Sequence, residues 1–198
     1  ETPWTNKLIW GDNKYVLSSL IEGDPSVGLE PLAGKVDLIY IDPPFATGAD
    51  FSVNVTVGDD SVTKEPTAIE EVAYRDTWHA GASSYLQMMY DRLVLSRDLL
   101  AEDGSIYVHC DWRMNASLRS LLNEVFGTEC FTNEITWKRT TAHGDAAQGA
   151  RHYDVVHDSI LFYVKNPNQY AWHTQYIAFS DEQVAQQYNK IEDGRRYR

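Results

Sequence analysis

VDLIYIDPPFATG, residues 36–48, is a mostly apolar run that stops abruptly on an aspartate and two prolines. Its first six residues are typical of a strand. Pro43 fixes its own φ and biases Asp42 toward an extended conformation, while Pro44 stiffens the next step. Ligands of an open parallel sheet lie at the carboxyl ends of its strands. We therefore expect Asp42, the Pro43 carbonyl and the Phe45 ring to face one small volume.

This arrangement suits a planar group that carries an NH₂. An exocyclic amine of a nucleobase is a poor nucleophile because its lone pair is delocalised into the ring. If Asp42 and the Pro43 carbonyl each accept one hydrogen bond from the amine, the nitrogen is held toward tetrahedral geometry. Its lone pair then points away from the two acceptors, where an aligned methyl donor could react with it. The base must first leave the duplex stack, and stacking on Phe45 offsets part of that cost. The alternative is a simple strand-ending turn, with Phe45 as a hydrophobe at its rim.

Short apolar runs alternate with longer helical patterns along the chain, which is typical of an α/β fold. Apolar positions in residues 85–100 recur on one helical face, and Gly127 marks the end of a later helix. The pattern predicts helices over 13–21, 85–100 and 115–126, and strands over 7–10, 36–41, 105–110, 134–138 and 158–164. The connection between the last two strands is long and polar, as in functional or disordered loops.

The 198 residues, 43% of them hydrophobic, are enough for one globular domain. No run approaches the roughly 18 apolar residues of a membrane span, and the first residues lack the features of a signal peptide. Cys110 and Cys130 form neither a metal-like pair nor a disulfide framework, which fits a reducing compartment. We therefore expect a cytoplasmic protein without a membrane or metal site.

Several segments together resemble the amino-methyltransferases of DNA, in the β arrangement of their motifs. The segments follow one another over nearly the whole chain: LIWGDN, VDLIYIDPPFATG, YLQMMYDRLVLSRDLLAEDGSIYVHCDWR, LLNEVFG, NEITWKRTTAH, HDSILFYVK and GRRYR. The resemblance implies a Rossmann-like, S-adenosylmethionine-dependent methyltransferase fold with a mostly parallel sheet, often found in restriction-modification systems. It implies a catalytic tetrapeptide, Asp42, Pro43, Pro44 and Phe45, in which Asp42 and the Pro43 carbonyl hold the amine and Phe45 stacks on the base.

The resemblance also concerns the cofactor. It places Gly11 and Asp12, after the first predicted strand, beside the adenosine end of S-adenosylmethionine, where the carboxylate accepts from the adenine amine. A helix N-cap ahead of Asn13 is an equally good interpretation of Asp12, and the two roles are compatible.

The sequence departs from the family pattern in one respect. Enzymes with this motif order carry a glycine-rich turn of the F-x-G-x-G type after the target-recognition region, and no G-x-G occurs in the 198 residues. We therefore expect residues 1–165 to form a partial catalytic domain that lacks its C-terminal cofactor-binding strands, and residues 166–198 to begin the target-recognition region. On this interpretation the chain alone is inactive, and the uncovered apolar face of the sheet favours a homo-oligomer or a partner.

The formal net charge of −12 argues against a surface that binds nucleic acid throughout, because phosphate contacts need local positive charge. The loop from 139 to 154 follows a strand of the predicted catalytic sheet and gathers positive residues. We expect it to lie on the DNA side and to bring Lys138, Arg139 and Arg151 to phosphates. The alternative for each cluster is an ordinary solvated surface.

The favoured function is methylation of the N6 amine of a flipped adenine in double-stranded DNA, because Asp in the first tetrapeptide position resembles adenine enzymes. The alternatives are an N4-cytosine DNA methyltransferase, a methyltransferase of another planar amine or amide such as a protein glutamine or an RNA base, and a non-catalytic nucleic-acid-binding fragment. A restriction subunit as partner stays open. Cys110 is not expected to be a nucleophile, because nothing nearby in the sequence activates it. His109 is interpreted as a core residue, with contact to DNA or cofactor as the alternative.

Overall fold

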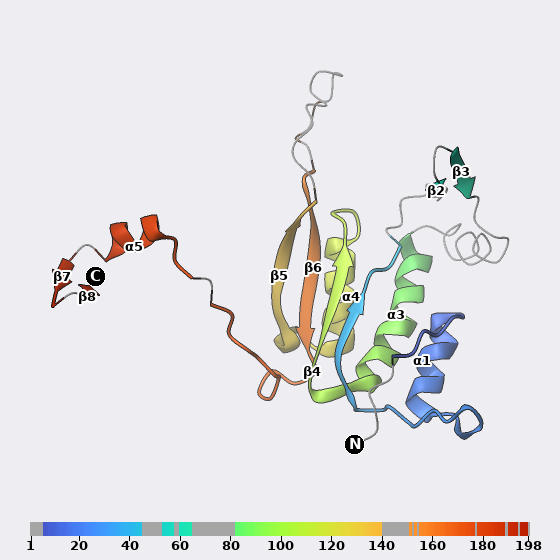
Figure 1. Cartoon of the computed structure of the whole chain (residues 1–198). Helices are drawn as coiled ribbons and strands as arrows, with labels where there is room; N and C mark the ends of the chain where they lie inside the picture. Colours follow the sequence, from blue (N-terminus) through green and yellow to red (C-terminus); the bar gives the residue numbers. More distant parts are fainter. Residues whose placement is uncertain are drawn as a thin grey trace.

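The computed structural model describes residues 6–44, 53–57, 60–64, 82–139, 151, 153, 155–176, 178–188, 190–193 and 195–197. The main sheet has four strands in the order β1-β4-β6-β5 (Figure 1). These strands are β1 (Val36–Ile41), β4 (Leu100–Cys110), β5 (Phe131–Lys138) and β6 (His157–Val164). β1 and β4 pair in parallel, whereas β6 runs antiparallel to both β4 and β5.

The predicted α/β class is confirmed, with a mixed sheet where a mostly parallel one was expected. The difference arises at β5 and β6, which follow one another in the chain and are also neighbours in the sheet. A parallel pairing of such strands requires a crossover back to the opposite end of the sheet. Here β6 starts at the end where β5 stops, with Lys138 opposite His157, so the two strands must run antiparallel.

Three helices lie on one side of this sheet (Figure 1). They are α1 (Asn13–Glu22), α3 (Ala82–Leu99) and α4 (Asn115–Phe126), and α3 contacts both of the others. Lys14 of α1 forms an ion pair with Asp91 of α3, Nζ to Oδ2 2.6 Å, which raises the pKa of Lys14 and lowers that of Asp91. Such surface pairs contribute little to stability, so α3 and α4 are held mainly by their apolar faces, which line the core.

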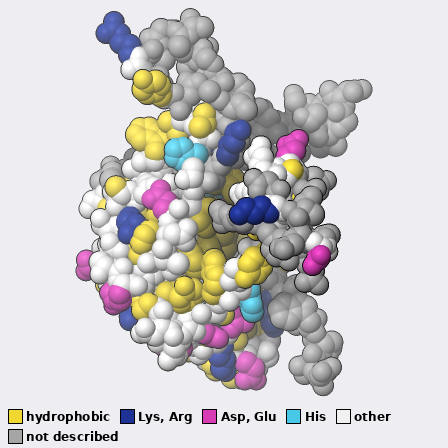
Figure 2. All heavy atoms as spheres, turned by 90° about the vertical axis from the view of Figure 1, so that its left-hand side faces the viewer, with side chains coloured by type: hydrophobic (Ala, Val, Ile, Leu, Met, Phe, Trp, Pro, Cys, Tyr) yellow, Lys and Arg dark blue, Asp and Glu magenta, His cyan; other side chains and the backbone are white. Residues whose placement is uncertain are grey.

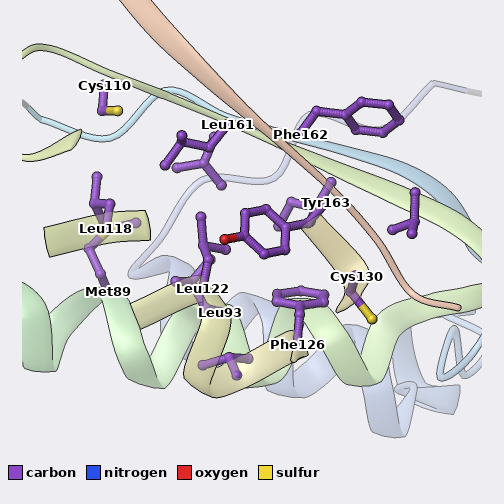
Figure 3. Packing of buried hydrophobic residues seen from close by; sticks show 14 of the residues in the cluster. Met89, Leu93, Cys110, Leu118, Leu122, Phe126, Cys130, Leu161, Phe162 and Tyr163 are labelled. Atoms are coloured by element: carbon purple, nitrogen blue, oxygen red, sulfur yellow. The ribbon is translucent and has the colours of Figure 1, made fainter. Parts of the chain in front are cut away.

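The core lies between α3, α4 and the facing side of β4 and β6. Alternate residues of β4 point into it, because successive side chains of a strand face opposite ways. Figure 3 shows the ring of Tyr163 beside Leu122 and Phe126, while Phe162 points away from them. The Tyr163 hydroxyl donates to Asn123 Oδ1 at 2.7 Å, which satisfies this buried polar group, and burial raises its pKa to about 12. The largest fully buried side chains include Tyr85, Met89, Leu93, Ile106, Leu118, Leu122 and Leu161.

The opposite face of the sheet has no helix among the described residues. Phe162 stacks on Tyr107, ring centroids 4.4 Å apart, and on Trp172 at 6.3 Å. Towards the edges the side chains are open to solvent: Leu38 is 59% exposed and Trp137 is 57% exposed. Figure 2 shows hydrophobic side chains across the middle of the visible face. This surface fits the predicted uncovered face, but the homo-oligomer stays a prediction.

The remaining described elements are short. They are the 3-10 turns η1 (Pro25–Val27) and η2 (Thr128–Cys130), the antiparallel pair β2 (Val53–Val57) and β3 (Asp60–Lys64), helix α5 (Asp181–Gln187), and the antiparallel pair β7 (Lys190–Glu192) and β8 (Arg195–Tyr197). Contacts with the sheet continue past residue 165, since Tyr170 packs against the core. The division into 1–165 and 166–198 stays a prediction. No helix among the described residues is both long and apolar enough to cross a membrane.

The strand predicted over residues 7–10 is wrong, because these residues form no strand in the structure. Leu8 is fully exposed and Trp10 is 87% exposed. A strand needs a neighbour to satisfy its backbone groups, and the described sheet gives this segment none. An apolar run alone therefore misled the prediction.

Candidate active site

The candidate site lies at one end of the main sheet. β1, β4 and β5 all finish at this end and β6 begins there, which is the upper end in Figure 1. The β1–β4 register places Ile41 opposite Val108. Asp42 directly follows Ile41, and His109 directly follows Val108. The two residues therefore lie side by side, although 67 positions separate them in the chain.

Asp42 leaves β1 with its side chain 61% exposed. Pro43 is buried and Pro44 is half-buried, so the turn is anchored while its carboxylate faces outward. His109 Nδ1 lies 3.0 Å from Asp42 Oδ1. Phe45 lies outside the described residues, so its stacking role stays a prediction. The strand-ending position predicted for Asp42 is confirmed.

His109 connects Asp42 to a second, buried carboxylate. Its side chain is 15% exposed, and its Nε2 lies 3.5 Å from Oδ2 of Asp158. Asp158 is 3% exposed, and its Oδ1 lies 3.4 Å from the guanidinium of Arg139. The guanidinium of Arg139 supplies a positive charge beside Asp158, which compensates the buried carboxylate. We call the four side chains Asp42, His109, Asp158 and Arg139 the acid–base row.

A second hydrogen-bonded group lies beside this row. Glu134 Oε1 accepts from Ser159 Oγ and from Asn115 Nδ2, both at 2.6 Å. The Ser159 hydrogen bond lowers the pKa of Glu134, burial opposes the shift, and Asn115 adds to it. The group ties the start of α4 to β5 and β6, and so fixes the end of the sheet that carries the site.

The turn after β4 presents an aromatic ring at the same end of the sheet. Asp111 is buried and accepts from the backbone N of Arg113 at 2.9 Å and from its guanidinium. Trp112 is 61% exposed, and the Arg113 guanidinium lies 5.2 Å from its ring centroid. Asp111 therefore holds a turn that leaves Trp112 open to solvent.

The predicted cofactor residues Gly11 and Asp12 lie at the start of α1. Asp12 is its N-cap: Oδ1 accepts from the backbone N of Lys14 at 2.9 Å, and also from the Arg92 guanidinium at 3.1 Å. The N-cap interpretation is confirmed. No contact among the described residues joins Asp12 to the acid–base row, so the contact with the adenosine end stays a prediction.

The predicted DNA-contacting residues lie around the end of β5. Lys138 is the last residue of β5, and Arg139 extends the pairing through its backbone N, which donates to Val156 O at 3.0 Å. Lys138, Arg139 and Arg151 are all exposed. The structure brings Arg139 to Asp158, whereas residues 140–150 lie outside the described part, so the role of the loop stays a prediction.

Cys110 points into the core and is completely buried. Burial, helped by the charge of Glu134, raises its pKa to about 12. A nucleophilic cysteine needs its thiolate, so this geometry excludes that role as the sequence analysis predicts. The described residues contain no cluster of side chains suited to a metal ion.

Comparison with known proteins assigns the chain to a family. Residues 36–197 match the model of the DNA methylase family N6_N4_Mtase. The chain belongs to this DNA methylase family. The matched span includes Asp42 and all strands of the main sheet. The resemblance noted in the sequence is thereby confirmed.

Individual relatives of this DNA methylase chain are longer than it is. It is 34% identical over 188 residues to the type II methyltransferase M.EcaI of Enterobacter cloacae, covering 94% of this chain and 35% of that protein. It is 31% identical over 174 residues to the Mod subunit of the type III restriction-modification enzyme EcoP15I of Escherichia coli, covering 82% and 24%. The chain thus spans about a third or less of these proteins.

Among solved structures, PvuII DNA methyltransferase (cytosine-N4-specific) is similar with a TM-score of 0.48 and 13% identity, covering 79% of this chain and 48% of that one. This distant likeness has no bearing on the chemistry of the site.

Two members of the acid–base row were missed by the sequence analysis. His109 was interpreted as a core residue, but β4 alternates, so the core position belongs to Cys110 and His109 faces the other way. Asp158 was predicted only to be the first residue of the strand over 158–164, with no role in the site. An alternation count along residues 105–110 was the available signal for His109, whereas nothing local marks Asp158.

Proposed function

We propose that this chain is part of a methyltransferase that transfers a methyl group from S-adenosylmethionine to the N6 amine of a flipped adenine in double-stranded DNA. One observation carries the proposal. In a chain of the DNA methylase family, an exposed Asp42 and an anchored Pro43 follow β1 at the end of the sheet where ligands of such folds bind.

The two acceptors in this turn would hold the amine. His109 occupies Oδ1 of Asp42, and the described residues give Oδ2 no hydrogen-bond partner. Oδ2 and the Pro43 carbonyl would each accept one N–H of the base, which leaves the nitrogen lone pair directed away from them. Bound S-adenosylmethionine would supply the methyl group to this lone pair, and the amine would pass one proton to water. Alignment of this kind supplies much of an enzyme's acceleration.

The described residues fit the adenosine end of S-adenosylmethionine in one respect. Asp12 uses only Oδ1 for the N-cap and for Arg92, so Oδ2 is left to accept from the adenine amine. Gly11 has a φ of 157° and lies directly before this carboxylate. When bound, the cofactor supplies the methyl group. The sequence has no G-x-G turn for its methionine end.

Adenine is proposed over cytosine because aspartate occupies the first position of the tetrapeptide. The relatives include Mod subunits of type III restriction-modification enzymes. We therefore propose that the whole protein modifies DNA within such a system and meets a restriction subunit.

The test uses the full-length protein that contains this chain, double-stranded DNA and S-adenosylmethionine, with mass spectrometry of the released nucleosides. We expect N6-methyladenine from the wild type and none from Asp42→Ala. Asp37→Ala is the matched control, because Asp37 is an exposed carboxylate on the same strand, away from the turn. Methylcytosine alone would contradict the adenine assignment. DNA binding without any methylated base would favour a non-catalytic module.

A further inference from the structure

His109 lies against the carboxylate that the proposed chemistry uses, but the family tetrapeptide does not include it. We propose that His109 is a positioning residue, which fixes Asp42 in the orientation that receives the amine. The proposal rests on the proposed function for its catalytic consequence, although the pairing itself is a property of this structure. It concerns a residue 67 positions away from Asp42 in the chain, brought there by the register of β1 and β4.

The contact has a defined direction. An ionised carboxylate only accepts hydrogen bonds, so the 3.0 Å contact requires the proton on His109 Nδ1. One oxygen of Asp42 is then committed to the imidazole and the other is presented outward. Without this donor, a side chain that is 61% exposed would rotate among several rotamers.

A second carboxylate lies on the other side of the His109 ring. Asp158 lies beneath the imidazole with Oδ2 3.5 Å from Nε2, and it is almost completely buried. Arg139 faces the other oxygen of Asp158 at 3.4 Å. Asp158 is the second residue of β6 and pairs with Trp137 of β5, so its backbone is held in the sheet. The acid–base row therefore runs from the rigid sheet to the exposed carboxylate.

Three substitutions separate positioning from space filling. The amide nitrogen of His109→Asn lies about where Nδ1 lies, so it still donates to Asp42. The amide of His109→Gln reaches the position of Nε2 and Asp158 instead. His109→Leu donates to neither. A residue that only fills space is replaced equally well by Leu or Gln, whereas a residue that orients Asp42 is replaced only by Asn.

The experiment measures kcat and KM for DNA with the full-length protein and its three variants. We expect a fall in kcat of about 10- to 100-fold in His109→Leu and His109→Gln, because misplacement of a reacting group costs that much. We expect His109→Asn to recover most of the loss, and KM for DNA to stay within about twofold of the wild type in all three. Thermal unfolding of each variant checks that it is folded.

Equal activity of His109→Gln and His109→Asn would overturn the proposal. A rise in KM for DNA with kcat unchanged would also overturn it, because that result would make His109 a DNA contact. A wild type that methylates no base refutes the proposed function rather than this inference. The pairing is then decided by NMR on protein labelled with ¹⁵N-histidine. The Nδ1 resonance of His109, assigned from His109→Asn, should shift in Asp42→Asn, and an unshifted resonance would contradict the pairing.

Discussion

Oδ1 of Asp12 accepts from the Arg92 guanidinium at 3.1 Å, which joins the first residue before α1 to the middle of α3. The same oxygen caps α1 by accepting from the backbone N of Lys14. Asp12→Ala should therefore lower the free energy of unfolding by about 0.5–2 kcal/mol, the usual cost of a lost N-cap. Asp12→Asn should retain most of the stability, because asparagine caps equally well. Denaturant titration of both variants gives the comparison, and equal losses would contradict the capping role.

Glu134 should make stability depend on pH in the acid range. Hydrogen bonds from Ser159 and Asn115 lower its pKa in the folded state. A lowered pKa adds stability above the unfolded value of about 4.3, and this stability is lost as pH falls through the folded pKa. The wild type should exceed Glu134→Gln in stability near neutral pH, and the difference should shrink in acid.

Glutamine keeps the oxygen that accepts from both partners, so this comparison isolates the charge. Unfolding curves of the two proteins at neutral pH and at about pH 3 measure the difference. If the difference in the free energy of unfolding between wild type and variant stays constant over this pH range, the Glu134 charge is not stabilised in the folded state.

The fold was predictable where one segment determines its own structure. β1 and α4 have the predicted bounds, because an apolar run before Asp42 and a helical repeat before Gly127 are local signals. Gly127 has a φ of 99°, which favours glycine at the end of the helix. Residues 7–10 failed because a strand depends on a partner that those residues do not specify.

The candidate site was predictable only in part, for the same reason. Asp42 is marked by its own prolines, whereas its contact with His109 depends on the β1–β4 register. That register shifts between Val36 and Leu38, where β4 carries extra residues around Gly104. A Cβ at Gly104 would lie 2.8 Å from the Val36 carbonyl oxygen, so the shift needs a glycine there. No local pattern reveals how many residues such an irregularity absorbs.

Both cysteines should be unreactive in the folded protein. Cys110 and Cys130 are buried, and burial is the main cause that raises the pKa of each thiol, for Cys110 to about 12. Alkylation requires the thiolate, so an alkylating reagent at neutral pH should modify neither residue until denaturant is added. Mass spectrometry of the two peptides, with and without denaturant, measures this. Rapid labelling of Cys110 under native conditions would mean that β4 opens easily.

Lys138 should contribute to DNA affinity without regard to sequence. It is exposed at the end of β5, beside the acid–base row. If it neutralises one phosphate, Lys138→Ala should reduce the slope of log K against log salt by about 0.9. Titration of the full-length protein against several duplexes at a series of salt concentrations measures the slope.

Lys35→Ala is the control for this measurement. Lys35 precedes β1 at the opposite end of the sheet, where its Nζ donates to Pro31 O at 2.8 Å. Its slope should equal that of the wild type. If both lysine variants change the slope alike, the effect comes from net charge and not from a contact near the site.

β1 forms one edge of the described sheet, paired with β4 on a single side. Every second peptide group of the strand therefore points away from any partner within that sheet. In deuterated water the inward amide protons of β1 would be retained, while the outward ones would be replaced quickly, giving protection with a period of two residues. Such an open edge is also a ready template for another strand. The strand that presents Asp42 is thus one of the two edges of this sheet that can gain a neighbour, and a strand added to β1 would run alongside the carboxylate.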